Sequence, residues 1–566
     1  MTVISTRIRI FSVFIFLMAL VLLVKLFFLQ VLKGESYNER ADRQYVTPVE
    51  NLFNRGSIFF KTKNGELVAA ASVKVGFKVA INPKGVEDAE AVFNALNAII
   101  ELNKEEFLAK AAKNDPYEEV AWKLDKKTAD EIALLKLHGV NIFKERWRFY
   151  PGNDLASHAV GFVAYSGDSL SGRYGLERFY NSVLERETDK LYVNFFAEVF
   201  ANLSSFVFEQ NETGDVITSI EPSIESILSE ALAGVIKKWD SENAGGIIIN
   251  PKTGSIYALA HLPQFNLNEF SKVASPLVFA NPLVENVYEY GSTIKPLTLA
   301  AALNEGLITA DTTYEDRGFV VVGKETINNF DKKGRGTASM QDVLNQSLNT
   351  GAVFVMQRLG KDRFRDYFYS FGLNEKTGVD LPNEAKNITN LESKQEIDYA
   401  STSFGQSIAL TPISAARAFS ILANGGFLTK PHLVTKIDRG AGLKDKEIAE
   451  PLGKQVIKTS TAEEITRMLV TVFDTSIVKN DPILSHYSVA AKTGTAQIAK
   501  EAGGGYYEDR HFHTFFGYFP AYNPEFLVLL YNRAPKGARF ATQTLSEPFM
   551  QIAKFLISYY EIPPDR

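Results

Sequence analysis

The sequence predicts an α+β protein in three parts: an N-terminal transmembrane helix, a mixed α+β pedestal, and a larger domain with an antiparallel sheet, flanking helices and a helical subdomain. Three observations predict this. An apolar run fills residues 10–32, a polar turn cluster occupies 211–215, and strand patterns lie at both ends of 216–566 with helical patterns between them. At roughly 100–200 residues per domain, 566 residues allow two or three folding units.

The apolar run at 10–32 predicts a membrane anchor. As a helix it would extend about 35 Å, enough to cross the hydrocarbon core of a bilayer. It ends without the Ala-x-Ala pattern of a cleaved signal peptide. Arg7 and Arg9 precede the run, so the positive-inside rule makes residues 1–9 a cytoplasmic tail. We expect a single-pass protein of the cell membrane whose remaining chain is extracytoplasmic.

Residues 33–215 are expected to form the pedestal. A strand pattern at 77–81 alternates with amphipathic helical patterns at 87–102 and 128–137, and no compact catalytic signature is present. The turn cluster Asn-Glu-Thr-Gly-Asp then precedes a new strand pattern, which predicts a domain boundary near residue 215.

Residues 216–566 are long enough to bury a core of their own. The first two strands are expected as a hairpin and three more follow near the C-terminus, at 245–249, 255–260, 486–491, 514–519 and 526–531. Helical segments, among them 295–304 and 351–359, lie between these groups. Strands at both ends with helices in the middle predict one antiparallel sheet with a helical subdomain.

Composition excludes several kinds of chemistry. With 45% hydrophobic and 22% charged residues the chain is expected to fold, and a net charge of −5 without a basic run argues against a nucleic-acid partner. There are no cysteines, which excludes disulfides, cysteine nucleophiles, zinc–thiolate sites and iron–sulfur clusters.

The first segment that could carry chemistry is Gly-Ser-Thr-Ile-Lys-Pro at 291–296. It opens a strongly helical stretch, so Ser292 lies at the amino end of a buried helix with Lys295 one turn further on the same face. A serine needs an adjacent base to become a nucleophile, and a desolvated lysine can serve as that base. Taken alone, the pair could equally be a helix cap and a surface lysine.

Two further segments are individually weak signals. Ser347 and Asn349 lie between two helical patterns, where an ordinary cap is the default interpretation. Lys-Thr-Gly-Thr at 492–495 continues a strand, and Gly494 inside it marks a close approach by a ligand or another backbone. A turn at a strand end is the alternative.

Together the three segments are far more specific. They follow the order S-x-x-K, S-x-N, K-T-G, with 55 residues from Ser292 to Ser347 and 145 from there to Lys492. This set resembles the penicillin-recognising serine acyltransferases. The chain is identified as a member of the class B penicillin-binding proteins by further segments at 290–296, 404–406, 411–412 and 492–497, and in the pedestal at 55–58, 64–65, 148–152, 158–161 and 175–177.

One departure from the family is visible. Phe60-Lys61 stands where these proteins usually carry an Asp-Arg pair, which puts a local pedestal salt bridge in doubt. The family layout otherwise implies a non-catalytic pedestal and dimerisation domain at 33–215, and a penicillin-binding serine transpeptidase domain at 216–566.

The resemblance implies D,D-transpeptidation of peptidoglycan stem peptides. Ser292 would attack the D-Ala-D-Ala carbonyl and Lys295 would take its proton. Ser347 would pass that proton toward the departing D-alanine, and Asn349 would orient Lys295 and bind the substrate amide. β-Lactams would acylate Ser292 as mimics of the peptide end.

The third motif would bind the donor peptide. Lys492 would anchor the electrostatics of the site, and Thr493 and Thr495, on either side of Gly494, would hold the terminal carboxylate. Backbone N–H groups of Ser292 and Thr495 would form the oxyanion hole. No metal or organic cofactor is implied, and the two imidazoles of 511–513 are interpreted as structural.

Within the family, Asn349 is like the division-specific, septal members, since many elongation-specific members carry aspartate there. Septal wall synthesis is therefore expected, with a polytopic lipid II polymerase and other cell-wall or divisome proteins as partners. The elongation role is the main alternative. A β-lactamase would not need so large a pedestal. A β-lactam sensor must transmit a signal inward, yet only about nine residues precede the apolar run. A non-catalytic scaffold would tolerate the loss of Ser292 or Lys295, and both are present.

Overall fold

The computed structural model describes Met18 and residues 54–166, 169–186, 213–440, 445–448, 453–477, 481–500 and 504–566. The predicted transmembrane helix lies outside these residues except for Met18. Within them, no helix combines the length and the apolar character needed to cross a membrane. By its contacts the chain forms two compact units: a smaller one that includes Val75–Trp147, and a larger one that includes Arg55–Lys74, Arg148–Arg186 and residues 213–566. The predicted boundary near residue 215 stays a prediction.

The smaller unit contains the predicted strand and both predicted helices. Strand β3 (Glu118–Leu124) pairs antiparallel with the second half of β2 (Leu67–Ile81), which β4 (Val140–Phe149) also joins. Each helix begins at a side chain that accepts a backbone N–H, which explains the starts of α3 (Ala89–Asn97), α4 (Lys104–Ala111) and α5 (Lys126–Leu134). Their apolar faces and the sheet share one core, which includes Val79, Phe93, Leu96, Phe107 and Ile132.

The larger unit begins with a second sheet. Its strands lie in the order β17 (Lys446–Glu447), β16 (Val434–Asp438), β7 (Asp215–Thr218), β1 (Ile58–Lys61) and the first half of β2. Phe60, the first residue of the pair that departs from the family pattern, is 2% exposed and packs in the apolar core of this unit. Short elements follow in the order α6 (Ser157–Val160), β5 (Val163–Ser166), β6 (Ser169–Gly172), α7 (Gly175–Phe179) and α8 (Asn181–Leu184).

The main sheet is antiparallel and contains all five predicted strands, in the order β18 (Ala490–Ala499), β19 (Tyr506–Phe519), β20 (Phe526–Arg533), β8 (Asn243–Ile249) and β9 (Ile256–Leu262). One boundary was wrong. The strand predicted at 486–491 begins only at Ala490, because Leu484–His486 forms a short 3₁₀ helix, η7, and β18 runs on through the Lys-Thr-Gly motif.

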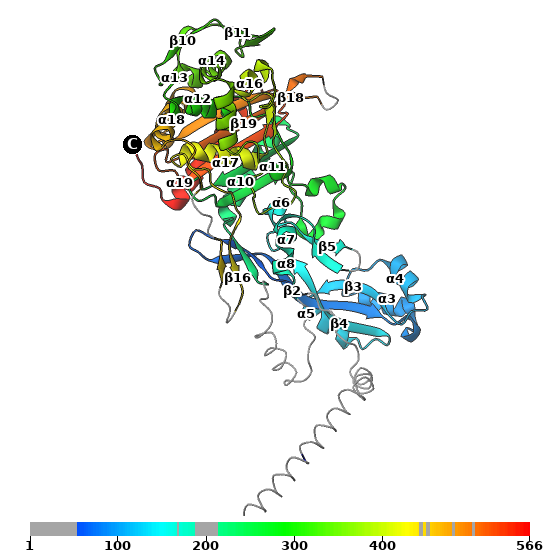
Figure 1. The fold of residues 1–566 in the computed structure, drawn as a ribbon. Helices are drawn as coiled ribbons and strands as arrows, with labels where there is room; N and C mark the ends of the chain where they lie inside the picture. The colour runs from blue at the N-terminus through cyan, green and yellow to red at the C-terminus, as the bar shows by residue number, and fades with distance from the viewer. Residues whose placement is uncertain are drawn as a thin grey trace, which may run out of the picture. The chain divides into compact units, whose positions relative to one another are not determined.

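Both faces of the main sheet are covered by helices. Ile248 and Phe515 pack with α10 (Pro222–Trp239) and α19 (Ala541–Tyr560), which contact each other. Their chain neighbours Ile247 and Phe516 point to the other face, toward α17 (Pro412–Ala423) and α18 (Thr459–Val472). Figure 1 shows β18 and β19 with α12 and α17 drawn across them. This burial explains why the strands are continuous apolar runs.

The helical subdomain carries the first two motifs. Its helices are α11 (Pro282–Glu285), α12 (Lys295–Asn304), α13 (Met340–Asn345), α14 (Asn349–Leu359), α15 (Lys361–Ser370) and α16 (Glu396–Thr402). Paired strands accompany them: β10 (Thr313–Asp316) with β13 (Gly336–Ser339), β11 (Phe319–Val322) with β12 (Glu325–Asn328), and β14 (Ile388–Thr389) with β15 (Ile408–Ala409). The remaining elements of the described residues are short turns of helix. Four are 3₁₀ turns, at Pro83–Gly85, Leu267–Lys272, Pro276–Phe279 and Gly291–Ile294, and one is a π turn at Phe473–Ile477.

Candidate active site

Ser292 and Lys295 meet at the start of α12. Gly291–Ile294 forms a 3₁₀ turn, η5, directly before the helix, and Gly291 adopts a φ of +55° that a side chain would strain. Lys295 Nζ lies 3.0 Å from Ser292 Oγ. The lysine is 0% exposed, so the alternative of a surface lysine is wrong. Burial, and then the nearby charge of Lys492, hold the pKa of Lys295 well below the usual 10.5.

Ser347 lies in the turn between α13 and α14. Lys295 Nζ donates to the Ser347 carbonyl oxygen at 2.6 Å and to its Oγ at 3.2 Å. The residue has a φ of +57°, which costs a serine of order 1–3 kcal/mol and persists only where the surroundings enforce it. Leu348 N donates to Val343 O at 3.0 Å and helps to close this turn. The second motif is therefore more than a simple cap.

Asn349 is the first residue of α14 and lines the same cavity as the two serines. Its Nδ2 donates to the backbone oxygen of Asn328 at 2.9 Å. The Lys295 ammonium is held instead by oxygens of Ser292 and Ser347. In this arrangement Lys295 is oriented by the Ser347 backbone, and the expected contact between Asn349 and Lys295 stays a prediction.

Lys492 approaches the serines from the main sheet. Its Nζ donates to Ser347 Oγ at 3.3 Å and to Thr493 O at 3.1 Å. The side chain is 3% exposed, and burial lowers its pKa to about 8. Ser347 Oγ thus lies between two ammonium groups, which makes it a natural relay for a proton.

Gly494 lets β18 lie directly against the segment that carries the nucleophile. A Cβ on this residue would lie 2.3 Å from Tyr290 O and 2.5 Å from Thr514 Oγ1. Thr514 in turn donates to Tyr290 O at 3.0 Å. The close approach that a glycine in this strand predicts is therefore to the backbone before Ser292. This contact holds the first and third motifs side by side.

A cavity of about 950 Å³ opens over these residues. Ser292, Ser347, Asn349, Thr493 and Thr495 line it, so the structure brings all three motifs to one cavity. Thr495 Oγ1 also accepts a hydrogen bond of 3.1 Å from Ala541 N, at the start of α19. Other residues that line the cavity were not predicted, because nothing in their local sequence marks them as functional: Asn328, Phe330, Lys332, Glu508, Arg539 and Phe540.

His511 also lines this cavity, whereas His513 is buried behind it. His513 Nδ1 lies 2.9 Å from Thr544 Oγ1, a packing contact with α19. Burial lowers the pKa of His513 to about 4. Within the described ranges, no group of three or more imidazole and carboxylate side chains is arranged to hold a metal ion.

Comparison with known proteins agrees with this geometry. Residues 244–554 match the penicillin binding protein transpeptidase domain, and residues 52–198 match the penicillin-binding protein dimerisation domain. Stage V sporulation protein D of Bacillus subtilis is 28% identical, over 97% of this chain and 85% of its own length. Peptidoglycan D,D-transpeptidase MrdA of Acinetobacter baumannii is 27% identical, over 90% and 82%. The crystal structure of penicillin binding protein 2X from Streptococcus thermophilus has a TM-score of 0.72, covering 90% of this chain and 80% of that one at 20% identity.

The fold and the site thus define a serine acyltransferase with a separate dimerisation domain. The chain belongs to the penicillin-binding protein transpeptidase family, in its class B, and is a serine-type D,D-transpeptidase.

Proposed function

We propose that Ser292 is the nucleophile of peptidoglycan cross-linking and Lys295 its base. The observation that supports this proposal most directly is that Lys295 is buried, has a lowered pKa, and has its Nζ 3.0 Å from the hydroxyl of Ser292. Ser292 Oγ attacks the carbonyl of the penultimate D-alanine as its proton passes to Lys295. The peptide bond to the terminal D-alanine then breaks, and an amine of a second stem peptide releases the enzyme.

The remaining motif residues receive matching roles. Ser347 Oγ, 3.2 Å from Lys295 Nζ and 3.3 Å from Lys492 Nζ, relays the proton to the departing D-alanine nitrogen. Thr493 and Thr495 bind the terminal carboxylate of the donor peptide, the charge of Lys492 attracts it, and Asn349 binds the substrate amide. The oxyanion is bound by backbone N–H groups of Ser292 and Thr495. Losing one such donor typically costs about 10²–10³ in rate.

Intact-mass measurement with benzylpenicillin tests the nucleophile. We expect residues 33–566 to gain one penicillin and to keep it for hours, and Ser292→Ala to gain none. Ser275→Ala, which removes the exposed cap of a 3₁₀ turn outside the cavity, is the matched control and should be acylated normally. An adduct that is lost within seconds while penicillin is consumed would favour a β-lactamase. No adduct on a folded wild-type protein would favour a non-catalytic scaffold.

We further propose that the enzyme acts in septal wall synthesis. The residue that supports this role is Asn349, since many elongation-specific members carry aspartate at that position. A polytopic lipid II polymerase and other divisome proteins would be its partners. Depletion in the native cell tests the role: filaments with unfinished septa are expected, whereas rounded cells would indicate the elongation role.

A single-pass topology with the N-terminus in the cytoplasm accompanies this role. It is supported by the apolar run at 10–32 and by the preceding Arg7 and Arg9. Alkaline extraction should leave the full chain in the membrane fraction and release a chain that lacks residues 1–32. A C-terminal alkaline phosphatase fusion should be active. Release of the full chain, or an inactive fusion, would contradict the proposed topology.

A further inference from the structure

Helix α14, which begins with the second motif, has no cap of its own. Its N-cap residue is Leu348, whose side chain cannot accept a hydrogen bond. A residue twenty positions upstream caps it instead: Asn329 Oδ1 accepts from the backbone N–H of Asn349 at 3.0 Å and of Thr350 at 3.3 Å. An asparagine is a strong helix cap, and here it is supplied across the fold.

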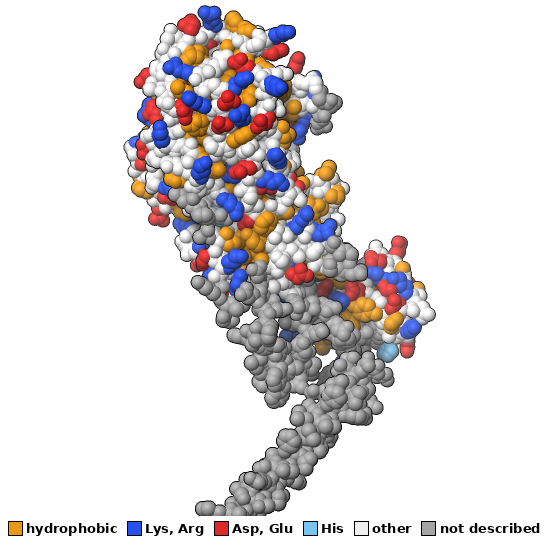
Figure 2. Space-filling model, in the orientation of Figure 1, with side chains coloured by type: hydrophobic (Ala, Val, Ile, Leu, Met, Phe, Trp, Pro, Cys, Tyr) orange, Lys and Arg blue, Asp and Glu red, His pale blue; other side chains and the backbone are white. Residues whose placement is uncertain are grey.

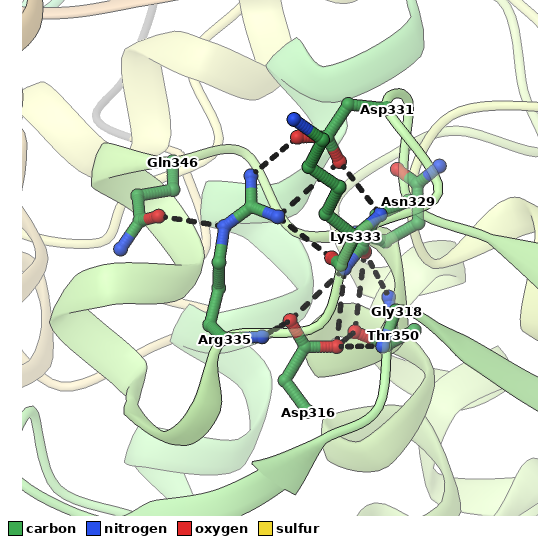
Figure 3. A network of polar contacts seen from close by, with 9 residues as sticks. Asp316, Gly318, Asn329, Asp331, Lys333, Arg335, Gln346 and Thr350 are labelled. Carbon is green, nitrogen blue, oxygen red and sulfur yellow. Dashed lines mark hydrogen bonds and ion pairs between the residues drawn. The ribbon is translucent and has the colours of Figure 1, made fainter.

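Asp316 determines which way the Asn329 amide faces. Asn329 Nδ2 donates to both carboxylate oxygens of Asp316 at 3.0 Å, so Oδ1 must point to the helix (Figure 3). Asp316 is 1% exposed and also accepts from Gly318 N, Arg335 N and Thr350 Oγ1. A buried carboxylate with this many donors is held firmly, and it passes its orientation on to Asn329.

This cap bears directly on the reacting groups. The turn that it closes carries Ser347, whose carbonyl and hydroxyl oxygens hold Lys295 Nζ. Asn328, the last residue of β12 and the chain neighbour of Asn329, accepts a hydrogen bond from the Asn349 side-chain amide through its backbone oxygen. A second clamp lies before Ser347, where Arg335 donates from Nε to Gln346 Oε1 at 2.9 Å and pairs with Asp331 (Figure 3). The serine is therefore held from both sides in its left-handed conformation.

We propose that Asn329, oriented by Asp316, is a positioning residue for acyl transfer. It contacts no reacting atom but holds Ser347 at hydrogen-bond distance from Lys295 and holds Asn349 at the wall of the cavity. The inference rests on the proposed function of Ser292 and Lys295. It predicts a loss of limiting acylation rate rather than a loss of penicillin binding.

A swap of the two side chains tests this inference. In Asn329→Asp two carboxylates face each other, and in Asp316→Asn the two amides face each other without a carboxylate between them. The double variant again has one amide facing one carboxylate. We expect each single variant to lower the limiting rate of benzylpenicillin acylation about 10²-fold, with a much smaller change in the half-saturating concentration. The double variant should recover part of that rate, because a carboxylate at 329 again accepts from Asn349 N while an amide at 316 can no longer accept from both Gly318 N and Arg335 N.

Asn387→Ala is the matched control. This buried asparagine accepts from Thr411 N and donates to Leu373 O and Ser414 Oγ, away from the cavity. It should lower the melting temperature but leave the limiting rate of the folded enzyme unchanged. Single variants with the wild-type limiting rate, or a double variant no faster than the singles, would overturn the inference.

A milder change keeps the test decisive if the single variants do not fold. Thr350→Val removes only the hydroxyl that bonds Asp316, Asn329 and Tyr314, and about a ten-fold lower limiting rate is expected. An unchanged limiting rate in this variant would also overturn the inference. Wild-type protein that is not acylated at all would instead overturn the proposed function.

Discussion

Lys295 and Lys492 are the two residues whose environment matters most for chemistry. Both ammonium groups are removed from water, and their hydrogen bonds go to hydroxyl and carbonyl oxygens. Desolvation penalises the charged form of a lysine, and the charge on Lys492 adds to this penalty at Lys295. The two lysines therefore differ in charge: Lys295 can be neutral and accept a proton, while Lys492 stays protonated.

This division predicts a bell-shaped pH dependence of acylation by benzylpenicillin. The rate should rise with pH as Lys295 loses its proton, because only the neutral amine can accept the proton of Ser292. It should fall above about pH 8, where Lys492 loses the charge that attracts the substrate carboxylate. A stopped-flow profile measures both limbs.

Lys492→Arg separates the two limbs, because an arginine stays charged throughout this range. We expect a lower maximal rate without the descending limb. A wild-type rate that keeps rising toward the ordinary lysine pKa of 10.5 would contradict the role of Lys492. A Lys492→Arg variant whose acylation rate still falls above about pH 8 would contradict it as well.

At the scale of elements, the site is the contact between one strand and one helix start. β18 contributes Lys492–Thr495 and η5 contributes Ser292, and no side chain separates them at Gly494. The third contributor, the start of α14, is held by Asn329. β18 and η5 thus meet through a backbone contact that allows little displacement, whereas the start of α14 is positioned by hydrogen bonds with the side chains of Asn329 and Lys295.

Gly494→Ala tests that contact. The added Cβ would lie 2.3 Å from Tyr290 O, which is backbone and cannot rotate away, so β18 must shift from Ser292. Acylation should fall by about 10²-fold or more, with a lower melting temperature. Gly234→Ala is the control: a Cβ there in α10 meets nothing within 4 Å, and stability should rise by up to about 1 kcal/mol. Normal acylation by Gly494→Ala would show that the strand can move without consequence.

At the scale of the whole molecule, the larger unit depends on ion pairs as well as on its apolar core. Glu177 is 0% exposed and accepts from Arg55 Nε at 2.7 Å and Arg148 Nε at 2.5 Å. Arg148 also donates to Gly56 O. This cluster joins Arg55, Arg148 and α7, all of which belong to the larger unit. On the face drawn in Figure 2, by contrast, basic and acidic side chains lie interspersed over the exposed surface of this unit.

Glu177→Ala should destabilise the larger unit strongly. Two buried guanidinium groups would lose their counter-charge, which typically costs about 3–5 kcal/mol. Urea unfolding of the protein checks this, with Glu547→Ala as the control. Glu547 pairs with Lys238 on the surface, where both side chains are more than half exposed, and little change is expected. Equal midpoints for the two variants would contradict a stabilising role for the buried cluster.

Much of this architecture could be predicted because its signals are local. The apolar run at 245–249 predicts a strand, and the amphipathic patterns at 87–102 and 128–137 predict helices, which the structure has as β8, α3 and α5. The start of β18 was misplaced because the 3₁₀ helix at Leu484–His486 is followed by an apolar stretch typical of a strand. The lining residues Phe330 and Arg539 could not be predicted, since an aromatic or basic residue in a loop carries no local mark of function.

The types of secondary structure, the order of the three motifs and the family can be predicted from the sequence, because residue periodicity and motif chemistry depend on neighbouring residues. The burial of Lys295 beside Ser347, the contact of Gly494 with Tyr290 and the capping of α14 by Asn329 are visible only in the folded structure. Each of these contacts joins residues that are twenty or more positions apart in the chain. Their distances depend on how sheet and helices pack together, and packing is a property of the whole folded unit rather than of any single segment.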